Sequence, residues 1–250
     1  MQTKNYIVNA FYLSWFDTKI RYKKSFLGPF WMTLGNLLGV VCLSIVWATL
    51  LNEDKQEFIP LLSIGLILWQ FISGVLSESP RILSENSATL RNMTVPIWFF
   101  PARLMGRNVI NLAHNVVLIF FIYIYIGRSV SSIALLAVPA ILLEMVILFN
   151  VAMILAGLGA RFRDIRYAIE VMLPLIFFVS PIIFRPGSFG NEFIWYNPIS
   201  YLVEVVRYPL MGQMPSNEIY LVFLFIFLAS VIANILYVKF AKDKVIYWVN

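Results

Sequence analysis

Long uncharged runs alternate with short charged stretches along the whole chain. About 20 apolar residues are enough for a helix to cross a hydrocarbon core of about 30 Å, so such runs indicate membrane spans. The fifth run is free of charge over only about 21 Å of helix, and we therefore begin this span near Tyr167, with Glu170 at the membrane interface. The pattern predicts an all-α polytopic membrane protein with six transmembrane helices: within 25–52, 58–77, 108–127, within 129–160, 167–184 and 219–238.

The segment before the first span has the pattern of an amphipathic helix. Val8, Phe11, Trp15, Tyr22 and Phe26 recur at helical spacing and fall on one face, while most charged residues lie on the opposite one. A helix of this kind lies in the headgroup plane, with its lysines toward anionic lipid. The chain therefore forms one membrane domain, 1–250, which divides into an N-terminal cytoplasmic interface helix (1–27), a six-span region (28–238) and a cytoplasmic tail (239–250).

Residues 185–217, between the last two predicted spans, are too apolar to form a free loop in water. The pair Asn197-Pro198 interrupts any helix here, because a proline disfavours helical geometry at the residue before it. We expect two short helices that meet near Asn197 and re-enter the outer half of the membrane, where surrounding protein satisfies their backbone polar groups.

Composition and charge support the membrane assignment and set its orientation. Of the 250 residues, 60% are hydrophobic and 13% are charged, whereas about a quarter of a soluble domain is charged. The 19 Lys and Arg lie in short loops, 15 of them on the side that holds both termini in a six-span topology. By the positive-inside rule that side is the cytoplasm, so the basic surplus requires no nucleic-acid partner.

The sequence lacks the groups that most enzymes and ATPases need. With one histidine and one cysteine, Cys42, it has neither a metal-ligand cluster nor a disulfide framework. The phosphate loop GxxxxGK[ST], the dinucleotide turn GxGxxG and the nucleophile motif GxSxG are also absent from the sequence. Any work against a gradient therefore has to draw its energy from a partner or from an ion gradient.

Polar and aromatic residues inside the predicted spans are candidates for a transport path. Glu144, at the centre of the fourth span, is either a carboxylate facing a conduit or a dimer interface, or a protonated group in an interhelical hydrogen bond. His114 fits a hydrogen-bonded packing role better than a proton relay, because no acidic residue shares its span. Trp69 lies near mid-span, where an interfacial aromatic belt does not explain it, which leaves sugar stacking or core packing.

The cytoplasmic segment 84–101 begins with cap-forming residues and ends at two prolines. These signals predict a short helix near 86–93. Such a helix is either a solvated connector between spans or a peg that docks on a soluble partner.

Five motifs in register resemble those of one protein family. The motifs are Arg21-Tyr-Lys-Lys-Ser-Phe-Leu-Gly-Pro-Phe-Trp31, Arg161-Phe-Arg-Asp-Ile165, Ser180-Pro-Ile-Ile183, Tyr196-Asn-Pro-Ile-Ser-Tyr201, and Arg207 with Met211-Gly-Gln-Met-Pro215. By these motifs the chain resembles, over essentially its whole length, the permease subunits of ABC exporters for cell-surface polysaccharides, such as O-antigen, capsule, teichoic acid and galactan. The loop after the second span departs from the family pattern, because Leu90-Arg-Asn-Met-Thr-Val-Pro96 keeps only part of it.

This resemblance implies a homodimer of permeases that pairs with two separately encoded nucleotide-binding ATPase subunits, which bind the ATP and magnesium. It implies that the interface helix and the loop after the second span contact the ATPase, and that the segment after the fifth span gates the outer side. The residues that we assign to ATPase coupling are Arg21, Lys23, Lys24, Asn86, Leu90, Arg91, Arg163 and Asp164. Those assigned to the conduit or gate are Trp31, Trp69, Phe71, Glu144, Tyr196, Asn197, Pro198 and Tyr201.

The sequence thus favours a permease, without catalytic residues or cofactors of its own, that exports an undecaprenyl-linked O-antigen-type polysaccharide across the bacterial inner membrane. Its partners are then the ATPase subunits, a second copy of the chain, membrane lipid and the lipid-linked polysaccharide. A capsule or teichoic-acid exporter has the same architecture and is the alternative within transport. A membrane-embedded enzyme acting on lipid-linked sugars would need clustered catalytic groups, whereas 185–217 offers scattered charges. A passive structural subunit would leave the two contact elements without a purpose.

Overall fold

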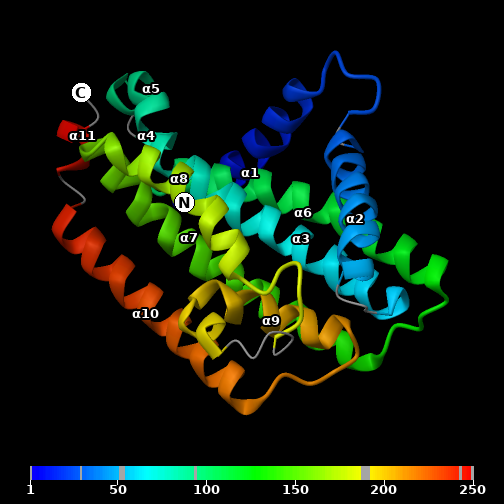
Figure 1. The fold of residues 1–250 in the computed structure, drawn as a ribbon. Helices are drawn as coiled ribbons and strands as arrows, with labels where there is room; N and C mark the ends of the chain where they lie inside the picture. Colours follow the sequence, from blue (N-terminus) through cyan, green and yellow to red (C-terminus); the bar gives the residue numbers. More distant parts are fainter. Residues whose placement is uncertain are drawn as a thin grey trace.

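The computed structural model describes residues 2–28, 30–50, 54–92, 95–186, 192–241 and 244–248. All regular secondary structure in these ranges is helical, as predicted (Figure 1). The elements are α1 (Gln2–Arg21), α2 (Phe30–Leu50), α3 (Lys55–Glu78), η1 (Ser79–Arg81), α4 (Ile82–Glu85), α5 (Ser87–Asn92), α6 (Phe99–Ile126), η2 (Ser132–Leu136), α7 (Ala137–Arg161), α8 (Asp164–Val179), η3 (Glu192–Tyr196), α9 (Pro198–Leu210), α10 (Asn217–Ala241) and α11 (Val245–Trp248).

Four helical stretches are long and apolar enough to cross a membrane. They are Lys55–Glu85, Phe99–Ile126, Ser132–Arg161 and Asn217–Ala241, at the positions of the second, third, fourth and sixth predicted spans. The other two predicted spans, the first and the fifth, are helical, but their apolar helical stretches are shorter. The described side chains of α2 give a continuous apolar stretch over Thr33–Val46, and α8 has 16 residues, about 24 Å of helix.

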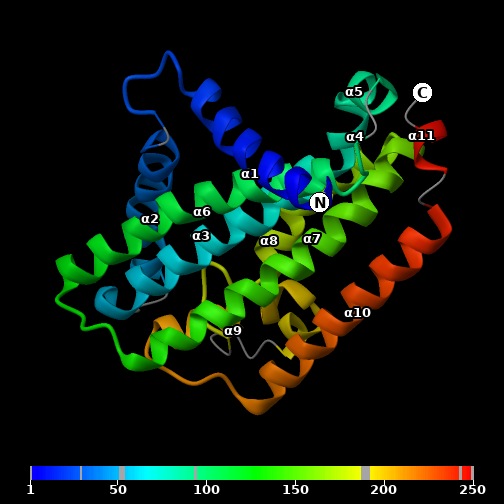
Figure 2. The same cartoon turned by 180° about the vertical axis from the view of Figure 1, so that it is seen from behind.

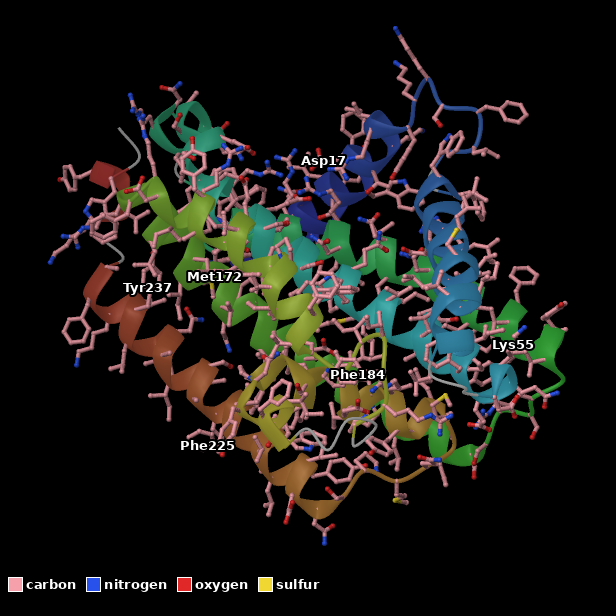
Figure 3. All side chains as sticks on the ribbon, in the orientation of Figure 1. Asp17, Lys55, Met172, Phe184, Phe225 and Tyr237 are labelled. Atoms are coloured by element: carbon pink, nitrogen blue, oxygen red, sulfur yellow. The ribbon has the colours of Figure 1, made fainter. Side chains whose placement is uncertain are left out.

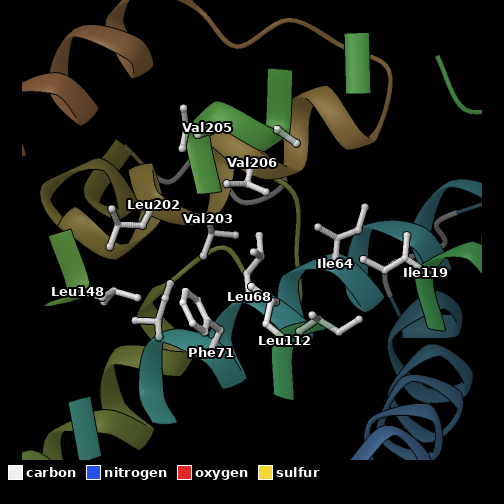
Figure 4. Close-up of a cluster of buried hydrophobic side chains, with 14 of the residues drawn as sticks. Ile64, Leu68, Phe71, Leu112, Ile119, Leu148, Leu202, Val203, Val205 and Val206 are labelled. Carbon is white, nitrogen blue, oxygen red and sulfur yellow. The ribbon is translucent and has the colours of Figure 1, made fainter. Parts of the chain in front are cut away.

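The hydrophobic core forms around α3, which packs against α2, α6, α7, α8 and α9. In the most apolar window of each helix, 61% of the residues of α3 are buried, compared with 17% for α10. Figure 4 shows Leu68 and Phe71 of α3 pointing toward Leu202, Val203 and Val206 of α9. Helix α3 is therefore the central helix of the bundle, whereas α10, which is apolar on all sides, exposes most of its apolar surface to the surroundings, which in a membrane are lipid.

The N-terminal helix α1 lies along α6 (Figure 2) and contacts it through small residues. Ala10, Ser14 and Thr18, one turn apart, are buried, and the Ser14 hydroxyl lies 2.8 Å from the carbonyl oxygen of Arg103. A side chain larger than hydrogen at Gly106 would collide with Ser14, so the close approach of the two helices depends on this glycine.

A neighbouring face of α1 carries exposed Val8, Phe11 and Trp15, as the amphipathic pattern predicted. The helix ends at Arg21, however, so the prediction that Tyr22 and Phe26 continue this face was wrong. A turn through residues 22–24 follows, and Gly28 then adopts a left-handed conformation with φ of 57°. This turn redirects the chain into α2.

The two ends of the molecule differ in what they expose. At the upper end in Figure 1 lie the C-terminal part of α1, α4, α5, α11 and the junction of α7 with α8. At the lower end lie α9, the N-terminal end of α3 and the connection that precedes α10; Figure 3 shows Asp17 and Lys55 at opposite ends. Helix α5 lies where the sequence predicted a short helix near 86–93, and α4, which was not predicted, precedes it.

Two short helices, η3 and α9, occupy the apolar segment before α10 and meet at Asn197. The Asn197 side chain caps α9, because its Oδ1 accepts a hydrogen bond of 3.0 Å from the backbone N–H of Ile199. Eight of the 13 residues of α9 are buried, which explains why so apolar a segment is not a free loop.

Candidate functional site

A polar cavity of about 540 Å³ opens at the upper end, between α1 and the hairpin of α3 and α6. It brings together two of the predicted coupling residues, Arg21 at the end of α1 and Asn86 between α4 and α5. Its other lining residues are Asp17, Ile20, Glu78, Arg81, Ile82, Glu85, Arg103 and Arg107. Four arginines therefore face three carboxylates in this cavity.

Ion pairs across this cavity join three elements into one unit. The carboxylate of Asp17 on α1 accepts two hydrogen bonds from the Arg103 guanidinium on α6, of 2.6 Å from Nε and 2.5 Å from Nη2. Glu78 of α3 pairs with Arg107 of α6. The pair of Asp17 and Arg103 is bidentate and so fixes orientation as well as distance. Together with the pair of Glu78 and Arg107, it links a displacement of α1 to α6 and α3.

The remaining predicted coupling residues lie at the same end but outside this cavity. Arg163 and Asp164 are exposed at the junction of α7 and α8, and Lys23 and Lys24 are exposed in the turn after α1. Arg91 is exposed on α5. Leu90 is buried and packs with Leu83, Phe99 and Phe100, so its side chain holds α5 on the bundle instead of facing outward.

A second cavity, of about 530 Å³, is a groove between α3 and α8. The α3 wall carries Trp69, Gln70, Ser73, Gly74 and Ser77, a polar stripe at helical spacing beside one tryptophan. Facing it on α8 are Glu170, Leu173, Pro174, Phe177 and Phe178. The rings of Trp69 and Phe177 lie 5.5 Å apart across the groove. Hydrogen-bonding groups between aromatic walls suit a polar chain with apolar faces, such as a sugar polymer.

The sequence analysis missed Gln70, which organises this groove. Its Oε1 accepts hydrogen bonds from the side-chain amides of Asn36 on α2, at 2.6 Å, and of Asn115 on α6, at 2.7 Å. One partly buried amide thus ties three helices together in an otherwise apolar region. The sequence did contain a signal of a polar stripe here, since Gln70, Ser73 and Ser77 share one face of the second span.

The predicted conduit residues lie in different environments. Trp31 is exposed on α2, Trp69 lines the groove, and Phe71 is buried in the core. Glu144 is fully buried within the chain, and neither of its carboxylate oxygens has a hydrogen-bond partner among the described residues. A conduit role for Glu144 therefore stays a prediction, and it would require α7 to move away from its neighbours so that the carboxylate is exposed.

The predicted gate residues are grouped at the lower end. Tyr196 is 89% exposed at the end of η3, whereas Tyr201 is half-buried and its ring lies 5.2 Å from that of Trp195. Asn197 Nδ2 donates a hydrogen bond of 2.7 Å to the hydroxyl of Ser180, which links α9 to the end of α8. Pro198 occupies the first turn of α9, where a missing N–H costs nothing.

A buried ion pair lies within α9, beside α3. Glu204 and Arg207 are each 2% exposed, and the Arg207 Nε lies 3.3 Å from a Glu204 carboxylate oxygen. The Arg207 side chain passes Gly65 of α3, where a Cβ atom would lie 2.5 Å from the carbonyl oxygen of Ile182 and 3.4 Å from Arg207 Nη1. The sequence analysis had treated these charges as scattered, because only the fold shows which helix covers them.

Within the described ranges, no group of three or more His, Cys, Asp or Glu could hold a metal ion. The chemistry of the two cavities is that of recognition: charged residues that fit a protein surface at one end, and a groove of amides, hydroxyls and aromatic rings between α3 and α8.

Comparison with known proteins gives a consistent result. The model of the ABC-2 type transporter family matches residues 9–211. Two proteins of Klebsiella pneumoniae named "O-antigen export system permease protein RfbA" are each 24% identical to the chain, one over 192 residues (75% of this chain, 74% of the relative) and the other over 207 (81% and 80%). A protein of the same name from Myxococcus xanthus is 21% identical over 176 residues, 70% of this chain and 68% of the relative.

Proposed function

Because this chain belongs to the ABC-2 type transporter family, we propose that it is the membrane permease of an exporter that moves a lipid-linked, O-antigen-type polysaccharide across the bacterial inner membrane. The names of its relatives support the O-antigen assignment, since all three are O-antigen export permeases. A permease of this family is a transport subunit, and we propose that a separate ATPase subunit binds ATP and magnesium and drives it.

We place six helices across the membrane: α2, α3, α6, α7, α8 and α10. Both termini are then cytoplasmic, at the end that holds α1, α4, α5 and α11 (Figure 1). Short α8 fits this arrangement if Arg166 and Glu170, which form an ion pair of 3.0 Å, lie at the cytoplasmic interface. In this orientation η3 and α9 re-enter the outer half of the membrane, and burial of α9 supports that position.

The cytoplasmic end is the proposed contact for the ATPase. Arg21, Asn86 and the arginines of the polar cavity offer donors to acidic groups, and Arg91, Arg163 and Asp164 are exposed beside them. The ion pairs that join α1 to α6 and α6 to α3 explain how a push on α1 reaches the spans.

The observation that carries the proposal is the groove between α3 and α8, with its polar stripe, its aromatic walls and the amide of Gln70. It is open on one side in the single chain. We propose that a second copy of the permease faces it, so that two grooves enclose one conduit, and that Tyr196 and Tyr201 close its outer end. Each copy would bind one ATPase subunit.

Export in cells tests this function directly. In a strain whose O-antigen permease gene is deleted, expression of this chain with its ATPase should restore surface polysaccharide, measured by immunoblot of isolated lipopolysaccharide. Without the chain, or with an inactivated ATPase, lipid-linked polymer should accumulate inside. Polymer that reaches the surface in the absence of the chain would refute the assignment.

One substitution examines the groove itself. Ser77→Trp should fill the groove and stop export while the protein still reaches the membrane, because only the proposed path is blocked. Leu224→Trp places the same side chain on exposed α10 and should export normally. Equal export by both variants would move the conduit away from α3 and α8.

A further inference from the structure

We propose that the corner formed by α1, α2 and α6 binds one anionic phospholipid of the cytoplasmic leaflet, with its phosphate between Lys19 and Lys23 and an acyl chain along the groove between α2 and α6. The leaflet assignment rests on the topology proposed above. The binding site itself rests on two adjacent cavities, neither of which belongs to the proposed conduit.

The first cavity, of about 740 Å³, is the proposed headgroup site. It lies beneath the C-terminal part of α1 and the turn that follows, and it is lined by Trp15, Phe16, Thr18, Lys19, Ile20, Tyr22, Lys23, Gly28 and His114. Its charged members are two lysines, and no described carboxylate forms an ion pair with either of them. Two unpaired ammonium groups one turn apart, beside aromatic rings, match a phosphate at the membrane interface.

The second cavity, of about 860 Å³, is the proposed acyl-chain site. Its walls come from α2 and α6, and apart from Lys55 at its far end the residues that line it are uncharged. The α2 wall runs from Phe30 to Ile45, about 22 Å of helix, which exceeds the roughly 15 Å depth of one leaflet. An acyl chain of the cytoplasmic leaflet therefore fits along it over the whole depth of that leaflet.

The two cavities meet at a pair of rings. Phe30 lines the groove and His114 lines the headgroup cavity, and their ring centroids are 6.1 Å apart in an edge-to-face arrangement. Leu27 and Gly28 are likewise divided between the groove and the headgroup cavity. A cationic chamber that continues into a long apolar groove is the shape of a binding site for an anionic amphiphile.

The position of the site argues for a phospholipid of the bilayer as the occupant. The headgroup cavity lies under an amphipathic helix whose exposed face carries Phe11 and Trp15, so it lies in the headgroup plane, where anionic phospholipid is abundant. The lipid would bridge α1, α2 and α6 and so hold α1 in the orientation that its pair with Arg103 also requires.

Native mass spectrometry of the purified full-length permease tests this. Released from detergent, the wild type should retain phosphatidylglycerol and bind it at least tenfold more tightly than phosphatidylcholine. Lys19→Gln with Lys23→Gln should weaken phosphatidylglycerol binding about 30-fold, because each interfacial lysine contributes roughly 1 kcal/mol. Lys24→Gln, which removes a neighbouring charge outside the cavity, should change the affinity less than threefold.

A pair of tryptophan variants tests the groove separately. Val41→Trp should fill the groove and abolish retention of the lipid, while Leu38→Trp, on the same helix but away from the lining, should not.

Equal binding of both lipids, or full binding by the double lysine variant, would overturn the proposal. Retention of a polyprenyl-linked glycan in place of phospholipid would also overturn it, because the site would then bind the export substrate. So would a dimer that Val41→Trp dissociates, because the groove would then be filled by the second copy of the chain. The measurement needs no ATPase and no export, so its failure would leave the proposed function standing.

Discussion

Gly65 shows how much a single residue decides in this chain. It lets α3 approach the Ile182 carbonyl and the Arg207 guanidinium so closely that no side chain fits between them. We expect Gly65→Ala to destabilise the protein by about 1–3 kcal/mol, the usual cost of overpacking, and to lower the thermal midpoint in detergent.

The matched control is Gly39→Ala on α2. A Cβ atom there meets nothing within 4 Å, so this variant should be as stable as the wild type or slightly more stable. A midpoint unchanged in both variants would mean that α3 and α9 are not packed as described.

The buried pair of Glu204 and Arg207 leads to a second prediction. Arg207→Met leaves the Glu204 carboxylate without its partner in the interior, and we expect a loss of about 3–5 kcal/mol in the free energy of unfolding. The double variant Glu204→Gln with Arg207→Met removes both charges and should recover most of that loss. Denaturant titration in detergent measures both variants, and a double variant as unstable as Arg207→Met would show that the pair is not the cause.

Single residues were predictable where the reason was local. The helix boundary at Asn197 followed from Asn-Pro, and the mid-span position of Trp69 left only sugar stacking or core packing for it. Gln70, Glu204 and Arg207 were missed because their roles depend on partners more than 30 residues away in α2 and α6, or on a glycine in α3. The shared face of Gln70, Ser73 and Ser77 can be read from the sequence, but the distant partners that give these residues their roles cannot.

Among the elements, α1 depends on small side chains for its position on α6. We expect Ser14→Leu to push α1 away from Gly106 and Arg103, and therefore to speed tryptic cleavage at residues 21–24. Tyr12→Leu, on the exposed side of α1, is the control and should be cleaved at the wild-type rate. Equal cleavage of the two variants would mean that α1 is held by other contacts.

The segment of η3 and α9 predicts a pattern of cysteine labelling. In a Cys42→Ser background, single cysteines at Ile194, Leu202 and Val203 should react slowly with a membrane-impermeant thiol reagent added outside, because these positions are buried. A cysteine at the exposed Tyr196 should react fast. Uniformly fast labelling at all four positions would make the segment an ordinary loop, whereas protection that is relieved during ATP turnover would support the gate.

Most helices followed from periodicity, caps and prolines, and these included α1, the short helices before α6, and the four long apolar stretches. The end of α1 was misplaced because residues 22–26 keep the apolar spacing after the chain has left the helix. The partner of α1 could not be foreseen, since its contact face is small and polar instead of apolar.

At the scale of the molecule, we propose that this chain forms the transport path and that a separate subunit hydrolyses ATP, and this has a simple biochemical consequence. The sequence carries no phosphate loop, so the purified chain in lipid should hydrolyse no ATP. Addition of the matching ATPase subunit should give turnover that depends on both proteins, measured by phosphate release. Robust hydrolysis by the isolated chain would contradict its assignment as a permease.

Helix α3 is continuous over 24 residues, about 36 Å, and its two ends do different things. Glu78 pairs with Arg107 at the end that we propose to be cytoplasmic, and Glu57 pairs with Arg185 near the other end. Between them, Gly65 lies against Ile182 and Arg207. A stiff helix transmits an axial shift with little loss, and no loop interrupts this one. An axial shift of α3 that begins beside Glu78 therefore also displaces the surface of α3 on which α9 packs.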